Sequence, residues 1–252
     1  MKALITGASS GIGRDMARVL SRRGYDLILV ARRRDRLEEL ARELPVKVRI
    51  ICLDLSGEKS CRELHDLTAE EKIDILINNA GFGLFGTFQE TDLEKELDLI
   101  DLNIRAVHIL TKLFLQDFIK RDSGYLLNVA SSAAFLPGPL MSSYYASKSY
   151  VFRLTEAIYE ELRRSGSRVS VSVLCPGPVK TEFEKTADVN FTIQKLESSR
   201  VAEYAIDRML RRKLVIIPGA IMKTARFFER FLPEKALLRA AWHMQERNMN
   251  GD

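Results

Sequence analysis

The fold of this 252-residue chain is decided by its first thirteen residues, MKALITGASSGIG (1–13). Residues 2–6 are a short apolar run typical of a buried strand, and a glycine-rich turn joins them directly to a helical pattern. Glycine lets a backbone approach a pyrophosphate closely, and the N–H groups at the start of a helix favour an anion. The turn therefore predicts a dinucleotide site that contains Gly7, Ser9, Ser10, Gly11, Ile12 and Gly13.

Short apolar runs alternate with longer helical patterns along most of the chain. The runs lie at about 2–6, 27–31, 47–53, 73–78, 125–130, 169–175 and 214–217. The helical patterns lie at 12–23, 36–44, 59–70, 93–120 and 143–165. Nearly continuous apolar runs are typical of strands that are buried on both faces. The pattern therefore predicts a three-layer α/β fold with a doubly wound parallel sheet of about seven strands.

Length and composition favour a single domain, because 252 residues with 46% hydrophobic residues can bury one core. No run of about 18 apolar residues occurs, so we expect no transmembrane helix, and the strand at 2–6 leaves no room for a cleavable leader. Cys52, Cys61 and Cys175 are widely spaced, which indicates reduced thiols in a cytoplasmic protein. We assign residues 1–217 to the dinucleotide-binding and catalytic domain and 218–252 to its helical C-terminal extension.

Charge and histidine content argue against a nucleic-acid-binding protein, a zinc protein and a Ser-His-Asp hydrolase. The net charge is +5, and basic residues concentrate in the last fifth of the chain: Arg208, Arg211, Arg212, Lys213, Lys223, Arg226, Arg230, Lys235 and Arg239. We interpret them as solvated helix faces and expect no nucleic-acid partner, because no aromatic-rich basic groove or known module accompanies them. The three histidines lie in unrelated positions, which argues against a zinc site or a Ser-His-Asp hydrolase.

The residues after the second and third strands bear on the choice of dinucleotide. Folds that prefer NAD place a carboxylate after the second strand, but this chain has Arg32 and Arg33 there. Arg32, together with Arg33, can bind the 2′-phosphate of NADP(H) through charge-assisted hydrogen bonds. Asp54, after the third strand, suits an acceptor for the adenine amino group; the alternative is an N-cap for the next helix, which Ser56 could equally supply.

Two further polar motifs occur at Asn78-Asn79-Ala80-Gly81 and at Asn103. The two amides of the first motif can join neighbouring loops, while Ala80 and Gly81 leave room for a ribose. Asn103 lies in an apolar stretch of the long helix. Its amide could hold a water that links Lys148 to solvent, or it could bond a backbone carbonyl, and the sequence leaves both interpretations open.

The residues that predict chemistry are Tyr144 and Lys148, in Tyr144-Tyr145-Ala146-Ser147-Lys148. A spacing of four places both side chains on one helical face. A nearby ammonium would lower the pKa of the phenol, and Tyr144 would then serve as an acid and base near neutral pH. The hydroxyl of Ser131, just after the fifth strand, could steady a substrate oxygen.

Together these motifs resemble the short-chain dehydrogenase/reductase family over about residues 1–217. The resemblance rests on TGASSGIG (6–13), Asp54, NNAG (78–81), Asn103, Ser131, YYASK (144–148) and CPGPVKT (175–181). It implies a Rossmann-type fold with a catalytic tetrad of Asn103, Ser131, Tyr144 and Lys148. It also implies that Tyr144 rather than Tyr145, and Ser131 rather than Ser132, belongs to that tetrad.

The resemblance also implies the cofactor contacts and the reaction. Further contacts are implied at Leu55, Asn79, Ala80, Gly81, Tyr144, Lys148, Pro176, Gly177, Val179 and Thr181. Val179 would meet the nicotinamide and Thr181 the phosphates, and Ala-Arg-Arg resembles the NADP-preferring members. A hydride and the Tyr144 proton would then add across a C=O group, or leave a secondary alcohol. A nucleotide-dependent binding protein without turnover, and a non-redox lyase or epimerase, remain the alternatives.

Apolar residues follow several of these motifs, which predicts a steroid-like or acyl-chain-like carbonyl or alcohol as substrate. They are Phe82, Leu84, Phe85, Phe135, Leu136, Phe183, Phe191 and Ile193. Ordinary core packing is the alternative and accounts for about half of them.

The C-terminal segment combines an apolar face with basic residues, and Pro233 predicts two helices in place of one. We favour packing over the substrate cleft or against another subunit of a homo-oligomer, a dimer or tetramer. Peripheral contact with an anionic membrane is the alternative.

Overall fold

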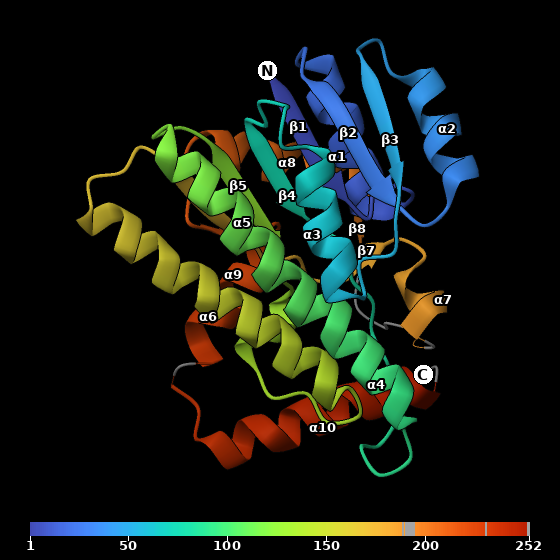
Figure 1. Ribbon diagram of the computed structural model, residues 1–252. Coiled ribbons are helices and arrows are strands. Elements are labelled where there is room, and N and C mark those ends of the chain that lie inside the picture. Colours follow the sequence, from blue (N-terminus) through green and yellow to red (C-terminus); the bar gives the residue numbers. More distant parts are fainter. Residues whose placement is uncertain (188, 190–194, 230, 251–252) are drawn as a thin grey trace.

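Seven parallel strands form the central sheet in the computed structural model, which describes residues 1–187, 189, 195–229 and 231–250 (Figure 1). The strands are β1 (Lys2–Thr6), β2 (Asp26–Ala31), β3 (Val48–Cys52), β4 (Ile75–Asn78), β5 (Tyr125–Val129), β6 (Ser170–Leu174) and β9 (Val215–Ile216). Their order is β3-β2-β1-β4-β5-β6-β9, and every neighbouring pair is parallel. The predicted doubly wound parallel sheet is therefore confirmed.

Helices cover both faces of the sheet. One face packs against α1 (Gly11–Arg22), α2 (Arg34–Glu43) and α8 (Ser198–Leu210), and the other against α3 (Glu58–Leu67), α5 (Val107–Lys120) and α6 (Ser142–Arg164). Successive residues of β1 alternate between the two cores: Ala3 and Ile5 join the first, and Leu4 joins the second. Burial on both faces explains why these strands are continuous apolar runs.

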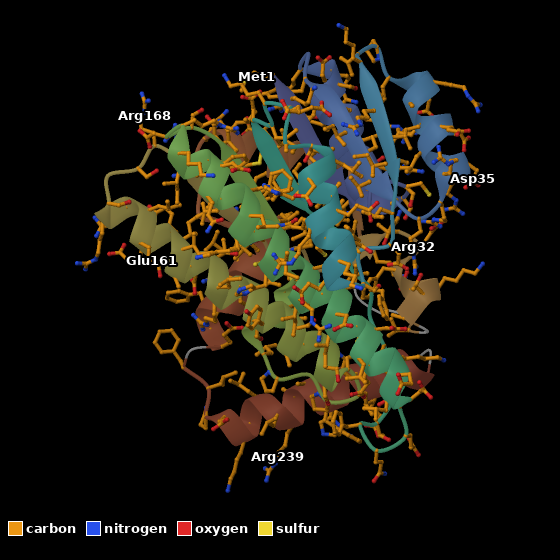
Figure 2. The ribbon with its side chains drawn as sticks, in the orientation of Figure 1. Met1, Arg32, Asp35, Glu161, Arg168 and Arg239 are labelled. Atoms are coloured by element: carbon orange, nitrogen blue, oxygen red, sulfur yellow. The ribbon has the colours of Figure 1, made fainter. Side chains whose placement is uncertain are left out.

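The order of the strands reverses between β1 and β4, which creates a crevice at the carboxyl edge of the sheet. Arg32 follows β2 and lies at the end of the sheet opposite Met1, as Figure 2 shows. The glycine-rich turn after β1 and the Asn-Asn-Ala-Gly motif after β4 therefore meet at this edge.

The structure adds detail where the sequence predicted one long helix at 93–120. That stretch comprises α4 (Leu93–Ile100), a π-helical segment (Asp101–Ala106) and α5. A π segment adds a residue per turn and often occurs at functional sites, but the apolar spacing does not reveal it. Asn103 lies inside this segment.

The stretch 176–198, which belongs to none of the apolar runs or helical patterns identified in the sequence, also contains regular structure. β7 (Val179–Lys180) and β8 (Leu196–Glu197) form a separate parallel pair, and α7 (Phe183–Ala187) lies between them. A short 3-10 helix (Ser132–Phe135) follows β5.

The C-terminal extension forms α9 (Ala220–Glu229) and α10 (Glu234–Asn250), and the predicted break at Pro233 is confirmed. α10 runs across the end of α6 that carries Tyr145 (Figure 1). None of the helices in the described ranges is long and apolar enough to cross a bilayer.

A buried polar network joins the centre of the sheet to the helices beneath it. Asn78 Nδ2 donates to Asn128 Oδ1 at 2.9 Å and to Thr111 Oγ1 at 3.1 Å. Asn128 Nδ2 in turn donates to Thr155 Oγ1 at 3.0 Å. These four side chains are at most 2% exposed, so no water replaces a lost partner.

We expect Asn128→Ala to lower the free energy of unfolding by about 2–4 kcal/mol, because it leaves the Asn78 amide and the Thr155 hydroxyl buried without that partner. Urea denaturation followed by circular dichroism measures the loss.

Ser172→Ala on the neighbouring strand β6 is the matched control. Ser172 is fully buried, and its Oγ has no hydrogen-bond partner within the described part of the chain. Its removal should therefore be neutral or slightly stabilising. Equal losses in the two variants would contradict the role assigned to the network.

Candidate active site

A cavity of about 500 Å³ opens at the carboxyl edge of the sheet and brings the sequence motifs together. Nearly all the residues predicted to bind cofactor or substrate line it: Gly7, Ser9, Ser10, Gly11, Ile12, Arg32, Arg33, Asp54, Leu55, Asn79, Ala80, Gly81, Ser131, Tyr144, Lys148, Pro176, Gly177, Val179 and Thr181. Gly13 and Asn103 do not line it but lie behind its wall.

The glycine-rich turn is built around close backbone contacts. Gly7 has a φ of +66°, and a Cβ there would lie 2.8 Å from Ala80 Cα. A Cβ on Gly13 would lie 2.5 Å from the Gly7 carbonyl oxygen, so only glycine lets α1 begin this close to the turn.

Thr6 and Asn79 join the ends of β1 and β4 beneath this turn. Thr6 Oγ1 accepts from Asn79 N at 2.9 Å and from Ala80 N at 3.1 Å. Asn79 Nδ2 donates to the carbonyl oxygens of Thr6 and Gly7 at 3.0 and 3.2 Å. The expectation that these amides join neighbouring loops is therefore confirmed for Asn79, and Asn78 joins strands instead.

The N-terminus of α1 borders the cavity. Ser10 occupies the N-cap position but makes no side-chain capping bond, and Ser10 and Gly11 both line the cavity. A helix start that is uncapped by its own side chain suits a bound phosphate.

The two arginines after β2 point to different partners. Arg33 donates from Nη2 to Ser9 Oγ at 3.1 Å and to Ser10 Oγ at 2.9 Å, so its guanidinium lies against the glycine-rich turn. Arg32 is largely exposed and pairs with Asp54 at 3.5 Å. Arg33 therefore lies closer to the glycine-rich turn than Arg32 does, although the sequence favours Arg32 for the main role in binding the 2′-phosphate.

Asp54 is turned toward its own loop. Its Oδ1 accepts from Ser56 N at 3.1 Å and from Ser56 Oγ at 2.9 Å. Although partial burial opposes the shift, these bonds and Arg32 hold the pKa of Asp54 below its ordinary value. The alternative role of Asp54 as an N-cap is not observed, because Gly57 occupies that position of α3.

Tyr144, Ser131 and Lys148 meet at the centre of the cavity. Tyr144 and Lys148 lie on one face of α6, and Lys148 Nζ is 5.8 Å from the centre of the Tyr144 ring. Lys148 Nζ donates to the Val129 carbonyl oxygen at 3.1 Å. A hydrogen bond links the side chains of Tyr144 and Ser131.

The pKa of Tyr144 is raised, which corrects the expectation that Lys148 lowers it. Burial raises the pKa of Tyr144 above its ordinary value, and the hydrogen bond with Ser131 opposes this shift only in part. Burial likewise lowers the pKa of Lys148 to about 8. Desolvation is therefore the dominant influence on both groups, and the phenol carries its proton at neutral pH.

Asn103 is fully buried and bonded to protein atoms on both sides of its amide. Its Nδ2 donates to the Phe82 carbonyl oxygen at 2.9 Å and to Ser147 Oγ at 3.1 Å, while its Oδ1 accepts from Phe82 N at 3.1 Å. Of the two interpretations left open by the sequence, the backbone-bonded one is confirmed for the side chain. Asn103 thereby fixes the segment after β4 at the cavity wall.

The Pro-Gly-Pro-Val-Lys-Thr segment closes the cavity from above the glycine-rich turn. A Cβ on Gly11 would lie 2.9 Å from Thr181 Cγ2, so the two segments are in contact. Val179 is buried in the cavity wall.

The far end of the cavity is apolar. Of the expected apolar residues, Phe82, Phe135, Leu136 and Phe183 line it, whereas Leu84 and Phe85 pack in the neighbouring core. Phe191 and Ile193 lie outside the described residues.

The C-terminal helices supply wall residues, among them Arg226. This corrects the interpretation of Arg226 as part of a solvated helix face, because its guanidinium packs over the rings of Phe135 and Phe152. Met222, Ala225, Arg226 and Glu229 of α9, and Met244 and Gln245 of α10, line the cavity. Gln245 Nε2 donates to Tyr145 Oη at 2.6 Å. The expected packing of this segment over the cleft is therefore confirmed, although Phe227, Phe228 and Phe231 remain exposed on α9 and the turn after it.

Comparison with known proteins identifies relatives in sequence and in fold. An uncharacterized oxidoreductase of Staphylococcus epidermidis is 30% identical over 81% of this chain and 88% of its own length. Human 17-beta-hydroxysteroid dehydrogenase type 3 is 32% identical over 75% of this chain and 62% of its own length. A short-chain dehydrogenase from Sphingobium yanoikuyae, solved in complex with NADPH, superposes with a TM-score of 0.81 at 34% identity, covering 87% of this chain and 88% of that chain.

The model of the short chain dehydrogenase family matches residues 1–190, which include the glycine-rich turn, Tyr144 and Lys148. The match covers well over half of the chain, and the seven-stranded parallel sheet agrees with it. This protein therefore belongs to the short-chain dehydrogenase/reductase family of oxidoreductases.

Proposed function

We propose that this protein is an NADP(H)-dependent oxidoreductase that interconverts a carbonyl and a secondary alcohol on an apolar substrate. The observation that carries the proposal is that Tyr144, Ser131 and Lys148 meet in the same cavity as the glycine-rich turn. An acid and base group, a hydroxyl donor and a phosphate-binding turn are the parts that such a transfer needs.

The residues present fit a dinucleotide. Gly7 and Gly13 give the backbone room, the start of α1 suits the pyrophosphate, and Arg33 with Ser9 suits a 2′-phosphate. The NADPH complex of the Sphingobium yanoikuyae relative supports this choice of cofactor. When bound, the nicotinamide supplies or accepts the hydride.

The chain's own residues would handle the proton and the oxygen. The Tyr144 phenol, held protonated by burial, donates its proton to the substrate oxygen as negative charge develops there. Ser131 donates a hydrogen bond to the same oxygen. Lys148 would hold the ribose and keep a positive charge beside the phenol, and Asn103 fixes the wall around Gly81 and Phe82. A protonated phenol is the form that carbonyl reduction requires.

The apolar end of the cavity supports a steroid-like or acyl-chain-like substrate. Phe82, Phe135, Met141 and Phe183 line it, and Met222 and Met244 complete it from the C-terminal helices. The similarity to a human hydroxysteroid dehydrogenase supports the same class.

Tyr144→Phe should lower kcat for ketone reduction by at least about 100-fold while cofactor binding and the fold stay intact, because only the transferable proton is lost. Steady-state kinetics on a panel of apolar ketones, followed at the absorbance band of the reduced nicotinamide, measures this.

Tyr145→Phe is the matched control, since it removes the neighbouring hydroxyl, which Gln245 contacts. It should change kcat only mildly. Comparable activity of Tyr144→Phe and the wild type would overturn the proposed mechanism.

Arg33→Ala should weaken NADP(H) binding by about 1.5–3 kcal/mol, roughly 10- to 150-fold, and leave NAD(H) binding nearly unchanged. Arg32→Ala should give a smaller loss, because Arg32 is largely exposed and pairs with Asp54. Calorimetric titration with NADPH and NADH measures both.

Arg34→Ala controls for the loss of a nearby positive charge, since Arg34 pairs with Glu38 at 3.8 Å and does not line the cavity. Wild-type protein that binds NADH as tightly as NADPH would contradict the proposed cofactor.

Lys148→Met should raise the free energy of unfolding of the cofactor-free protein at pH 7 by about 1–3 kcal/mol. The pKa of Lys148 falls from an ordinary 10.5 to about 8 in the folded state, so below pH 8 the folded protein retains a charge that burial disfavours. Between pH 8 and 10.5 the unfolded wild type binds more protons than the folded one, so the wild type gains stability and the gap closes.

Urea denaturation of both proteins at several pH values between 7 and 10 measures this gap. A variant that is less stable than the wild type at pH 7, or a gap that does not shrink at higher pH, would show that burial of this ammonium is not costly.

A further inference from the structure

A carboxylate from the segment after β7 pairs with two arginines at the start of α2: Arg33, which precedes the helix, and Arg36 in its first turn. Glu182 Oε2 accepts from Arg33 Nη1 at 2.8 Å, and Glu182 Oε1 accepts from Arg36 Nη1. Glu182 lines the cavity, and it directly precedes α7, which lies on the side of the molecule that carries α2 (Figure 1).

Every nitrogen of the Arg33 guanidinium therefore has a partner. Nε and Nη2 donate to the hydroxyls of Ser9 and Ser10, and Nη1 donates to Glu182. These bonds use four of the five N–H groups of the guanidinium, so a phosphate that binds here through two N–H groups must share or replace one of these partners.

The serines and the glutamate differ in what they offer a phosphate. A serine hydroxyl can rotate and donate its own proton to a phosphate oxygen, so Ser9 and Ser10 can stay in place. A carboxylate has no proton to give and repels the phosphate. Because Arg36 also holds Glu182, the negative charge stays close even after Arg33 has let go of it.

We propose that Glu182 is a specificity-determining residue, which competes with the 2′-phosphate of NADP(H) for Arg33 and leaves NAD(H) binding unaffected. The inference rests on the proposed function, since it requires the 2′-phosphate to bind at Arg33. Glu182 thereby limits the preference for NADP(H) that Arg33 provides.

The competition persists over the whole working pH range. Hydrogen bonds from Arg33 and Arg36 lower the pKa of Glu182 to about 2, so the carboxylate stays charged under any assay condition. Salt should weaken the competition between Glu182 and the phosphate, because the side chains of Arg33, Arg36 and Glu182 are about half exposed.

The test is Glu182→Gln, which keeps the size of the side chain and removes its charge. We expect the Kd for NADPH to fall by about three- to tenfold and the Kd for NADH to change by less than about twofold. Titrations with 2′,5′-ADP and 5′-ADP should show the same contrast, since these fragments isolate the adenosine end of the cofactor. The gain should shrink at about 0.5 M salt.

Glu203→Gln is the matched control. Glu203 is also held by two arginines, Arg22 at 3.1 Å and Arg23 at 2.7 Å, and it does not line the cavity. Its substitution removes an equal charge elsewhere and should leave both affinities unchanged. Combining Glu182→Gln with Arg33→Ala should abolish the gain, because no competition for Arg33 remains.

The proposal is overturned if Glu182→Gln leaves the NADPH-to-NADH affinity ratio unchanged. It is also overturned if Glu182→Gln weakens the binding of both cofactors alike, which would mean that Glu182 only holds its own segment in place. It is overturned as well if the gain in NADPH affinity persists in the Arg33→Ala background. The choice of NADP(H) as cofactor is tested separately, by the NADPH-to-NADH affinity ratio of the wild-type protein alone. A wrong cofactor can therefore be distinguished from a wrong role of Glu182.

Discussion

The hydrogen bonds between Thr6 and Asn79 are the constraint on which the rest of the site depends. They hold the ends of β1 and β4 together where the strand order reverses. Gly7 and Gly13 can then pack against the same amide, which fixes where α1 begins. A shift of this junction would move the phosphate-binding turn away from Tyr144 and Lys148, which stand on an independent helix of the opposite layer.

Much of this arrangement could be predicted from sequence because it is encoded locally. The apolar runs mark the strands, and a spacing of four places Tyr144 and Lys148 on one face. The contacts of Glu182 and Gln245 could not be predicted, since they join residues 149 and 100 positions apart without any local pattern. The raised pKa of Tyr144 was missed for a related reason: desolvation depends on tertiary packing, whereas the Lys148 neighbour is visible in the sequence.

The π-helical segment illustrates a different limit of sequence analysis. Its apolar spacing is helical, so residues 93–120 predicted one regular helix. Only the folded structure shows that the widened turn carries the Asn103 amide to the backbone of Phe82 and to Ser147. In a regular α-helix, without the extra residue of the π turn, the Asn103 side chain would point about 100° away from its present direction. It would then lose these partners. The π-helical turn and the buried Asn103 amide are therefore one structural feature. Considering Asn103 alone in the sequence does not reveal the turn.

The two ends of the cavity differ in a way that orients any bound pair of ligands. Arg32, Arg33 and the start of α1 make one end cationic, while aromatic and methionine side chains make the other end apolar. A dianionic phosphate gains nothing from the apolar end, and an apolar substrate gains nothing from the cationic one. Tyr144 and Lys148 lie between the two ends, where a nicotinamide and a carbonyl would meet. Because α9 and α10 build part of the apolar wall, residues outside the matched family region would share the choice of substrate with aromatic residues inside it, while Tyr144 and Lys148 inside it would perform the transfer.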